Sequence, residues 1–289
     1  MGYGEMFLVL VAGFLVLYLG VSVFLVYFRA HPRRICCNIT PDQYDLVYEE
    51  VTFAGCDAVE LSGWYIPSRN GAAIILTHGH GGNRGQVLDR AVILARRGYG
   101  VLLYDMCHHG ESGGKYAVGD RCCPNDVQSA FSYLRGREDV DPQRIGALGF
   151  SAGADATIVA AARTDGIRCI VLDGAYPGPV WNVVPPLTAL ELALLPMFWV
   201  NTVVMGWYTG VSQAPSFVQL IGEIAPRPIS FIATGLGGEQ RNGRRMYAAA
   251  GEPKTLWEIP EAAHGEGISR RPQEYAERLV AFFDHALSE

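Results

Sequence analysis

The sequence predicts an α/β fold: a doubly wound, mostly parallel sheet with a helical insertion, preceded by one transmembrane helix. Beyond Pro41, β-branched runs alternate with amphipathic stretches, as in a parallel sheet that helices cover on both faces. One long apolar segment without charges lies near the N-terminus, and a second apolar, aromatic stretch interrupts the alternation at residues 178–222. We therefore divide the 289 residues into an anchor with a basic flank (1–34) and one large domain (35–289).

The apolar segment Met6–Phe28 is expected to be a membrane anchor. At about 1.5 Å per residue it reaches roughly 35 Å, which is enough for a hydrocarbon core of ~30 Å. The alternative, a cleaved signal peptide, requires a basic leading region, a shorter apolar core and a small-x-small cleavage site, and none of these is present. Glu5 precedes the segment and Arg29, Arg33 and Arg34 follow it, so the positive-inside rule predicts a single-pass protein whose main domain faces the cytoplasm.

The main domain is expected to open with an antiparallel pair of strands, 46–53 and 58–66, before the first fully buried strand, 72–77. Short links then join the remaining elements. These are helix 84–97, strand 100–104, helix 125–135, strand 145–150, helix 152–163, strand 168–172, strand 228–234, helix 242–250, strand 255–259 and helix 271–287.

The insertion at 178–222 contains the run VPPLTALELALLPMFWVNTVVMGWYTG. Glu191, Pro196 and Asn201 interrupt it, and a second membrane span here would place the last two strands across the bilayer. We expect a helical lid whose apolar face rests on the membrane, with a buried connection inside the domain as the alternative.

The charge and the cysteine pattern argue against nucleic-acid binding, a disulfide framework and a metal site. The net charge is −6 and no basic run interleaved with aromatic residues occurs, so no nucleic-acid partner is expected. Seven cysteines, two pairs of them adjacent, are a poor basis for a disulfide framework. Cys107, His108 and His109 lie near Cys122 and Cys123 but lack metal-ligand spacing, so no metal site is expected.

The strongest motif is G-x-S-x-G at residues 149–153, placed between an expected strand and an expected helix. In this context the turn holds Ser151 in a strained conformation, with its hydroxyl at the end of the sheet. Ser151 is therefore the candidate nucleophile.

Several segments resemble the α/β-hydrolase superfamily, in the family's order, over nearly all of residues 45–289. His78-Gly79-His80-Gly81-Gly82-Asn83 is similar to the family's HGxGG oxyanion loop. The resemblance implies that the backbone N–H groups of His80 and Ala152 form the oxyanion hole. His78 is expected to support this loop.

The segment from Asp105 to Gly114 is similar to the D-x-R-G-H-G-x-S-G-G segment of relatives that resemble serine aminopeptidases and monoacylglycerol lipases. Cys107 and His108 stand where that segment has Arg and Gly, which puts the local loop geometry in doubt. His109 is expected to be structural.

His264 follows the last expected strand, where the superfamily places its general base, and the order of Ser before His is also the superfamily's. The orienting acid is less clear, because glycines occupy its usual position in the segment GLGGEQ (235–240). Glu239 is the favoured acid, and Asp173, at the end of the preceding strand, is the alternative. A dyad that lacks an acid is the third possibility.

These residues predict a serine hydrolase that needs no cofactor and cleaves an ester or thioester through a Ser-His-acid triad and an acyl-enzyme. The anchor and the apolar insertion favour a lipid-like acyl substrate. A membrane-bound serine peptidase or amidase is the alternative within the same mechanism. A non-catalytic scaffold with a hydrolase fold is the alternative from another class.

Overall fold

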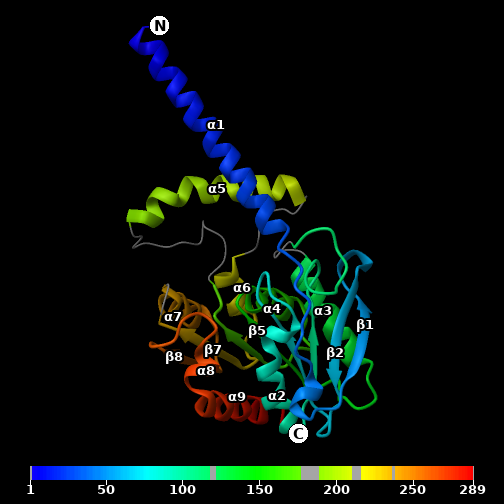
Figure 1. Cartoon of the computed structure of the whole chain (residues 1–289). Helices are drawn as coiled ribbons and strands as arrows, with labels where there is room; N and C mark the ends of the chain where they lie inside the picture. The colour runs from blue at the N-terminus through cyan, green and yellow to red at the C-terminus, as the bar shows by residue number, and fades with distance from the viewer. Residues whose placement is uncertain (1, 118–121, 177–188, 210–215, 236–237, 289) are drawn as a thin grey trace.

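The computed structural model describes residues 2–117, 122–176, 189–209, 216–235 and 238–288, which include one large sheet (Figure 1). Within these ranges, eight strands pair in the order β1-β2-β4-β3-β5-β6-β7-β8. The strands are β1 (Glu49–Ala54), β2 (Glu60–Ile66), β3 (Ala73–Thr77), β4 (Gly100–Tyr104), β5 (Ile145–Phe150), β6 (Ile170–Asp173), β7 (Ile229–Thr234) and β8 (Lys254–Ile259). β1 and β4 each pair antiparallel with β2, and all other neighbours are parallel.

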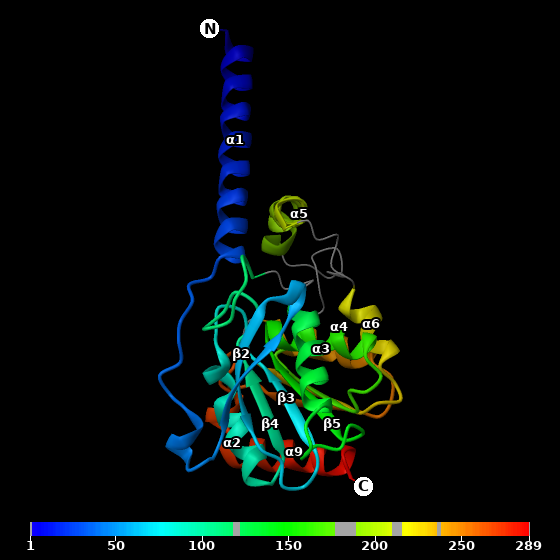
Figure 2. The same ribbon diagram turned by 90° about the vertical axis from the view of Figure 1, so that its right-hand side faces the viewer.

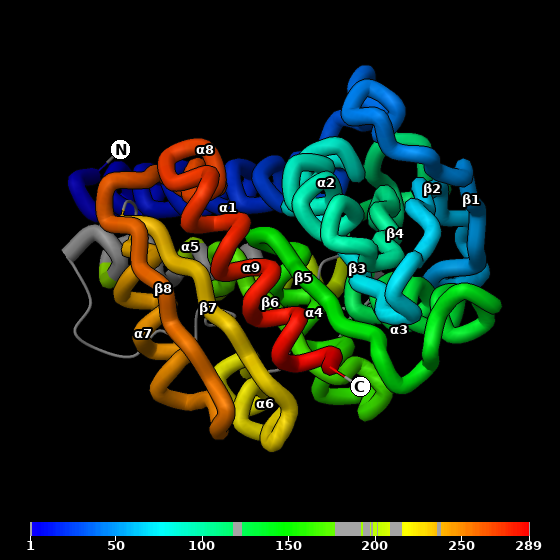
Figure 3. Tube along the Cα trace, turned by 90° about the horizontal axis from the view of Figure 1, so that it is seen from below, coloured from blue at the N-terminus to red at the C-terminus, as the bar shows by residue number. Residues whose placement is uncertain are grey.

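Helices cover both faces of the sheet. The helices of the described residues are α1 (Tyr3–Ala30), α2 (Leu88–Arg96), α3 (Cys122–Arg135), α4 (Ala152–Arg163), α5 (Ala189–Thr209), α6 (Phe217–Glu223), α7 (Glu239–Ala249), α8 (Gly267–Arg270) and α9 (Pro272–Ala286), with short 3₁₀ turns at Pro41–Tyr44, Cys56–Ala58 and Arg84–Val87. α2 and α9 pack on one face, and α3, α4, α6 and α7 form a continuous layer on the other (Figures 2 and 3). Seen from below, β1 and β2 lie at one edge of the sheet and β7 and β8 at the other (Figure 3).

Alternation along the central strands divides the core between the two faces. In β3, Ile75 belongs to the cluster that contains Phe131 of α3, whereas Ile74 and Leu76 belong to the cluster that contains Phe283 of α9. Successive side chains of a strand point to opposite faces, so a run of consecutive apolar residues fills both cores.

The structure confirms the predicted fold class, a mostly parallel α/β sheet with helices on both faces. Helix α3 begins at Cys122 rather than at 125, because Pro124 is tolerated in the first turn of a helix. Helix α7 begins at Glu239 rather than at 242, after Gly238 in the left-handed conformation (φ 78°). The expected insertion contains α5 and most of α6, while residues 178–188 and 210–215 of it lie outside the described residues.

Helix α1 extends away from the sheet, and most of its apolar side chains are exposed (Figure 1). Of the residues that the structure describes, α1 is the helix long and apolar enough to cross a membrane, a property that signal sequences share. Its buried residues Ser22, Val26 and Ala30 lie one turn apart near its C-terminal end. α5 packs against α1 and crosses it at this end (Figures 1 and 2).

Candidate active site

Ser151 occupies a strained turn between β5 and α4. Its φ of 53° and ψ of −120° are a conformation that costs on the order of 1–3 kcal/mol outside glycine. The turn is held because the Ser151 N–H donates to the main-chain oxygen of Asp173 at 2.8 Å. Gly153 is required here, since a Cβ at that position would overlap the main-chain oxygens of Thr77 and His78. The predicted strand–turn–helix context of Ser151 is therefore present.

His264 lies beside this turn, in the loop that follows β8. Its ring stacks on the ring of Phe150, the residue before Ser151, with 5.1 Å between centroids. A Cβ added to Gly174, the residue after Asp173, would lie 2.6 Å from Cε1 of His264. The carboxyl ends of β5, β6 and β8 thus bring His264 next to the turn that carries Ser151.

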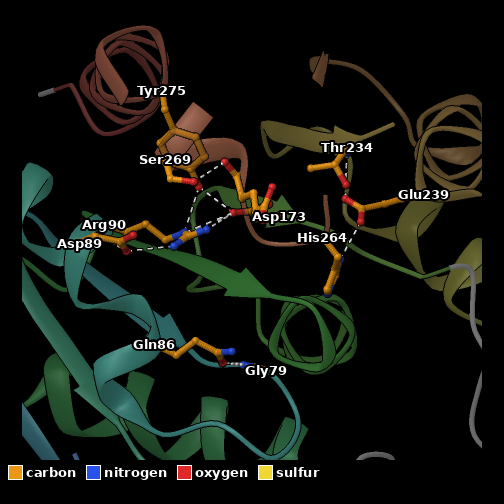
Figure 4. Close-up of polar contacts among 11 residues, drawn as sticks. Gly79, Gln86, Asp89, Arg90, Asp173, Thr234, Glu239, His264, Ser269 and Tyr275 are labelled. Carbon is orange, nitrogen blue, oxygen red and sulfur yellow. Dashed lines mark hydrogen bonds and ion pairs between the residues drawn. The ribbon is translucent and has the colours of Figure 1, made fainter. Parts of the chain in front are cut away.

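Glu239 contacts His264 directly. Its Oε2 lies 2.6 Å from Nδ1 of His264, and its Oε1 accepts the Thr234 N–H at 2.9 Å (Figure 4). Glu239 is the first residue of α7, where the helix dipole favours a negative charge. An ionised carboxylate can only accept hydrogen bonds, so Nδ1 of His264 donates the proton and Nε2 is left as an acceptor.

This contact changes the proton affinity of both groups. The hydrogen bond to Glu239 raises the pKa of His264, and it outweighs partial burial, which lowers that pKa. For Glu239, burial alone would raise the pKa, but the hydrogen bonds from His264 and Thr234 hold it below its usual value. The pair is therefore a carboxylate beside an imidazole that binds a proton more readily than a free histidine.

Asp173, the alternative acid, has different partners. Its Oδ2 lies 2.6 Å from Nη2 of Arg90 and accepts the Tyr275 hydroxyl at 2.8 Å (Figure 4). Asp173 is 1% exposed, so it forms a buried ion pair beneath the turn of Ser151. The sequence does not indicate this pairing, because Arg90 and Tyr275 are 185 positions apart and follow no local pattern.

The HGHGG segment, which follows β3, lies against the turn of Ser151. A Cβ added to Gly79 would be 3.2 Å from Cβ of Ser151. The Gly79 N–H donates to Oε1 of Gln86 at 2.8 Å, which fixes the start of the segment (Figure 4). His80 follows directly, and Ala152 begins α4, where the first N–H groups have no acceptor within the helix. The two predicted oxyanion donors therefore lie in segments that meet at Ser151.

His109 holds the HGHGG segment through a hydrogen bond. Its Nε2 accepts the Gly81 N–H at 3.1 Å, and its Nδ1 lies 3.0 Å from the main-chain oxygen of Cys107. A backbone N–H can only donate and a carbonyl oxygen can only accept, so the ring is neutral with its proton on Nδ1. Burial lowers the pKa of His109, which favours this neutral form.

His78 is held in the same way. Its Nδ1 lies 2.7 Å from the main-chain oxygen of Gly79, and its Nε2 accepts the Met106 N–H at 3.0 Å. Complete burial lowers the pKa of His78 to about 3, and the charge of a protonated His109 nearby is the second cause. Both rings are thus neutral hydrogen-bond connectors between the segment after β3 and the segment after β4. In the described parts of the chain, no group of three or more His, Cys, Asp or Glu side chains is arranged to hold a metal ion.

Comparison with known proteins places this site in a family. The family model described as serine aminopeptidase, S33, matches residues 68–223, which contain both the HGHGG segment and the G-x-S-x-G turn. The chain belongs to this family. The match ends before Glu239 and His264, so it covers the S33 family's nucleophile turn and leaves those two residues untested.

Similar proteins agree with an α/β-hydrolase fold. The uncharacterized protein YfhR of Escherichia coli is 28% identical over 251 residues, which cover 83% of this chain and 82% of that protein. A thiohydrolase, aneE, of Aspergillus aculeatus is 31% identical over 137 residues, which cover 46% of this chain and 43% of that protein. An esterase structure from Pyrococcus furiosus is 24% identical, with a TM-score of 0.70, and the similarity covers 90% of this chain and 99% of that one. The S33-family chain is thus a hydrolase-type protein with the α/β-hydrolase fold.

Proposed function

We propose that this protein is a serine hydrolase that cleaves an ester or thioester of a lipid-like acyl group. Ser151 is the nucleophile, His264 the general base and Glu239 the orienting acid. The observation that carries the proposal is the 2.6 Å contact between Glu239 and His264, at a histidine whose ring stacks beside the strained turn of Ser151. Asp173 is a weaker candidate for the acid, because Arg90 and Tyr275 already take its carboxylate.

The reaction follows from these roles. Nε2 of His264 accepts the Ser151 hydroxyl proton while Oγ attacks the acyl carbonyl, and Glu239 stabilises the imidazolium that forms. The imidazolium then gives its proton to the leaving alcohol or thiol, and the acyl group stays on Ser151. Water attacks this ester with His264 again as base, which releases the acid and restores Ser151.

The developing negative charge on the carbonyl oxygen requires donors that are already in place. The backbone N–H groups of His80 and Ala152 supply them, and each such donor is worth about 10²–10³ in rate. Because His109 and Gln86 hold the HGHGG segment through hydrogen bonds, it needs little rearrangement on binding substrate.

The choice of substrate rests on location and on relatives. The apolar helix α1 supports a single-pass membrane anchor. Arg29, Arg33 and Arg34 near its C-terminal end favour a catalytic domain on the cytoplasmic side, next to acylated membrane molecules. Similar proteins include an esterase and a thiohydrolase, which supports an ester or thioester. The S33 description names aminopeptidases, so an amide substrate is the second candidate.

A fluorophosphonate probe tests the proposal on the full-length protein in detergent or vesicles. We expect covalent labelling of the wild type and none of Ser151→Ala. The control Ser288→Ala, which changes an exposed serine near the C-terminus, should label fully. A folded wild type that takes no label would instead support a non-catalytic scaffold. Parallel assays with a p-nitrophenyl ester, an acyl thioester and an aminoacyl p-nitroanilide separate the substrate classes.

A further inference from the structure

Helix α5 carries an exposed apolar stripe that the proposed chemistry does not use. It consists of Leu192, Trp199, Val203 and Trp207, whose exposed fractions are 61%, 58%, 51% and 84%. At about 100° per residue these positions fall within one narrow sector of the helix. Two tryptophans with more than half of their surface exposed are unusual for a soluble protein, so this stripe is expected to bind a partner.

At the C-terminal end of α5, a residue on the side away from the stripe contacts the hydrolase domain. Tyr208 lies on roughly the opposite side of α5 from the middle of the stripe, at about 100° per residue. Its ring contacts those of Tyr116 and His31, with centroids 6.1 Å and 5.9 Å apart. Tyr116 belongs to the segment that follows β4, so the Tyr208 side of α5 is the side turned to the domain.

The contact with α1 fixes the level of α5 along that helix. The buried residues of α1 are Ser22, Val26 and Ala30, and α5 lies across this end (Figure 2). Roughly twenty residues of α1 cover the hydrocarbon core of a bilayer. If the span begins near Met6, where the uncharged run starts, it ends near Leu25, close to the crossing with α5. The helix α5 therefore lies at the membrane surface nearest the domain.

We infer that α5 is an interfacial membrane helix, whose stripe is buried at the boundary between lipid headgroups and acyl chains. This inference rests on the anchor in the proposed function and extends it to the route of the substrate. Tryptophan is enriched at this boundary because its ring is apolar while its N–H needs a polar partner. Arg29 lies in the last turn of α1 and Arg33 and Arg34 follow the helix, where anionic headgroups would attract cations.

The C-terminal end of α1 and the residues after it lie beside the proposed active site. The main-chain oxygen of Ala30 accepts the Ala117 N–H at 2.7 Å, which ties the end of α1 to the segment after β4. Pro32 lies about 4 Å from where a Cβ of Gly81 would be, in the HGHGG segment. With α5 at the interface, an acyl substrate enters from the bilayer, between the end of α1 and the HGHGG segment. The enzyme therefore acts on esters or thioesters dissolved in the membrane.

Quenching by brominated lipids tests this in the full-length protein, because α1 contains no tryptophan. Vesicles of phosphatidylcholine with brominated acyl chains should quench the tryptophan emission. Trp199→Phe combined with Trp207→Phe should remove at least about half of that quenching, because Trp64 and Trp257 are buried in the domain. Trp257→Phe, which changes a buried tryptophan of the domain, is the matched control and should keep most of it.

Three results would overturn the inference, and they differ from one another. Equal quenching of the double variant and the wild type excludes lipid contact at α5. No quenching of a protein that floats with the vesicles, together with cross-linked dimers, assigns the stripe to a second copy of the chain. Failure to float shows that the anchor itself is wrong. Labelling by the fluorophosphonate probe reports the proposed chemistry separately from all three.

Kinetics give an independent test. We expect Trp207→Glu to lower hydrolysis of a long-chain ester presented in vesicles about tenfold, because a charge at the interface opposes insertion of the helix. Hydrolysis of a water-soluble short-chain ester should stay within about twofold of wild type, since Ser151, His264 and Glu239 are unchanged. Trp207→Leu, which keeps the stripe apolar, is the control. Equal loss with both substrates, or with neither, contradicts entry from the bilayer.

Discussion

Nδ1 of His264 lies 2.6 Å from Oε2 of Glu239, although glycines replace the usual acid in the segment after β7. The longer Glu side chain starts from the first residue of α7 and reaches back to the sheet, where the Thr234 N–H also holds it. A glutamate displaced along the chain thus occupies the place of an acid at the strand end.

Removing the charge of this carboxylate should impair catalysis and shift its pH dependence. We expect Glu239→Gln to lower kcat by about 10⁴-fold, because a neutral amide does not stabilise the imidazolium. The hydrogen bond to Glu239 raises the pKa of His264 above 6.5, and activity is lost as pH falls through that raised pKa and the base becomes protonated. The midpoint of kcat/KM against pH should therefore move to lower pH in Glu239→Gln.

The control for this shift is Glu261→Gln, which changes an exposed carboxylate paired with Arg271 in the same loop region. It should leave both kcat and the midpoint unchanged. A Glu239→Gln profile that superimposes on the wild type would show that the contact does not tune the base.

Asp173→Asn should act on stability more than on chemistry. It breaks a buried pair with Arg90, a change that costs about 3–5 kcal/mol where no other partner remains. Arg90 keeps its ion pair with Asp89, so we expect a loss at the lower end, about 3 kcal/mol. The free energy of unfolding, measured by urea titration, should fall by this amount, whereas Glu266→Gln in the exposed pair with Arg270 should cost about 1 kcal/mol or less. For folded protein, kcat of Asp173→Asn should exceed that of Glu239→Gln by at least about tenfold, and the reverse order would make Asp173 the acid.

The sequence predicts the sheet and the nucleophile turn well because both depend on local patterns. Residues 145–150 form a strand and 152–163 a helix as expected, since an apolar run, a glycine-rich turn and an alanine-rich helix are contiguous. The acid is different, because Asp173 ends β6 and Glu239 comes shortly after β7, and the carboxyl ends of these neighbouring strands lie at one edge of the sheet. Only the packing of Arg90 and Tyr275 against Asp173 separates their surroundings.

The sequence also does not predict that α5 packs on α1. Both segments are apolar along much of their length, so periodicity does not show which faces meet. The sequence predicts a helical insertion in residues 178–222, and α5 confirms a helix there, while its role as a lid stays a prediction.

The predicted orientation can be checked by protease protection. With Arg29, Arg33 and Arg34 on the cytoplasmic side, a C-terminal epitope tag should resist protease added outside sealed cells and be digested after the membrane is opened. An N-terminal tag should already be digested in sealed cells. Digestion of the C-terminal tag in sealed cells would reverse the orientation.

His109 offers a matched pair of variants that tests how the HGHGG segment is positioned. Nε2 of His109 accepts the Gly81 N–H, so His109→Gln, whose Oε1 reaches a similar position, should keep that acceptor, whereas His109→Asn is too short. Because the segment carries the proposed oxyanion donor of His80, and such a donor is worth about 10²–10³ in rate, we expect His109→Asn to lower kcat by roughly tenfold or more with KM little changed. His109→Gln should restore most of this loss. Equal kcat values in the two variants, with both folded by circular dichroism, would show that this hydrogen bond does not position the donor.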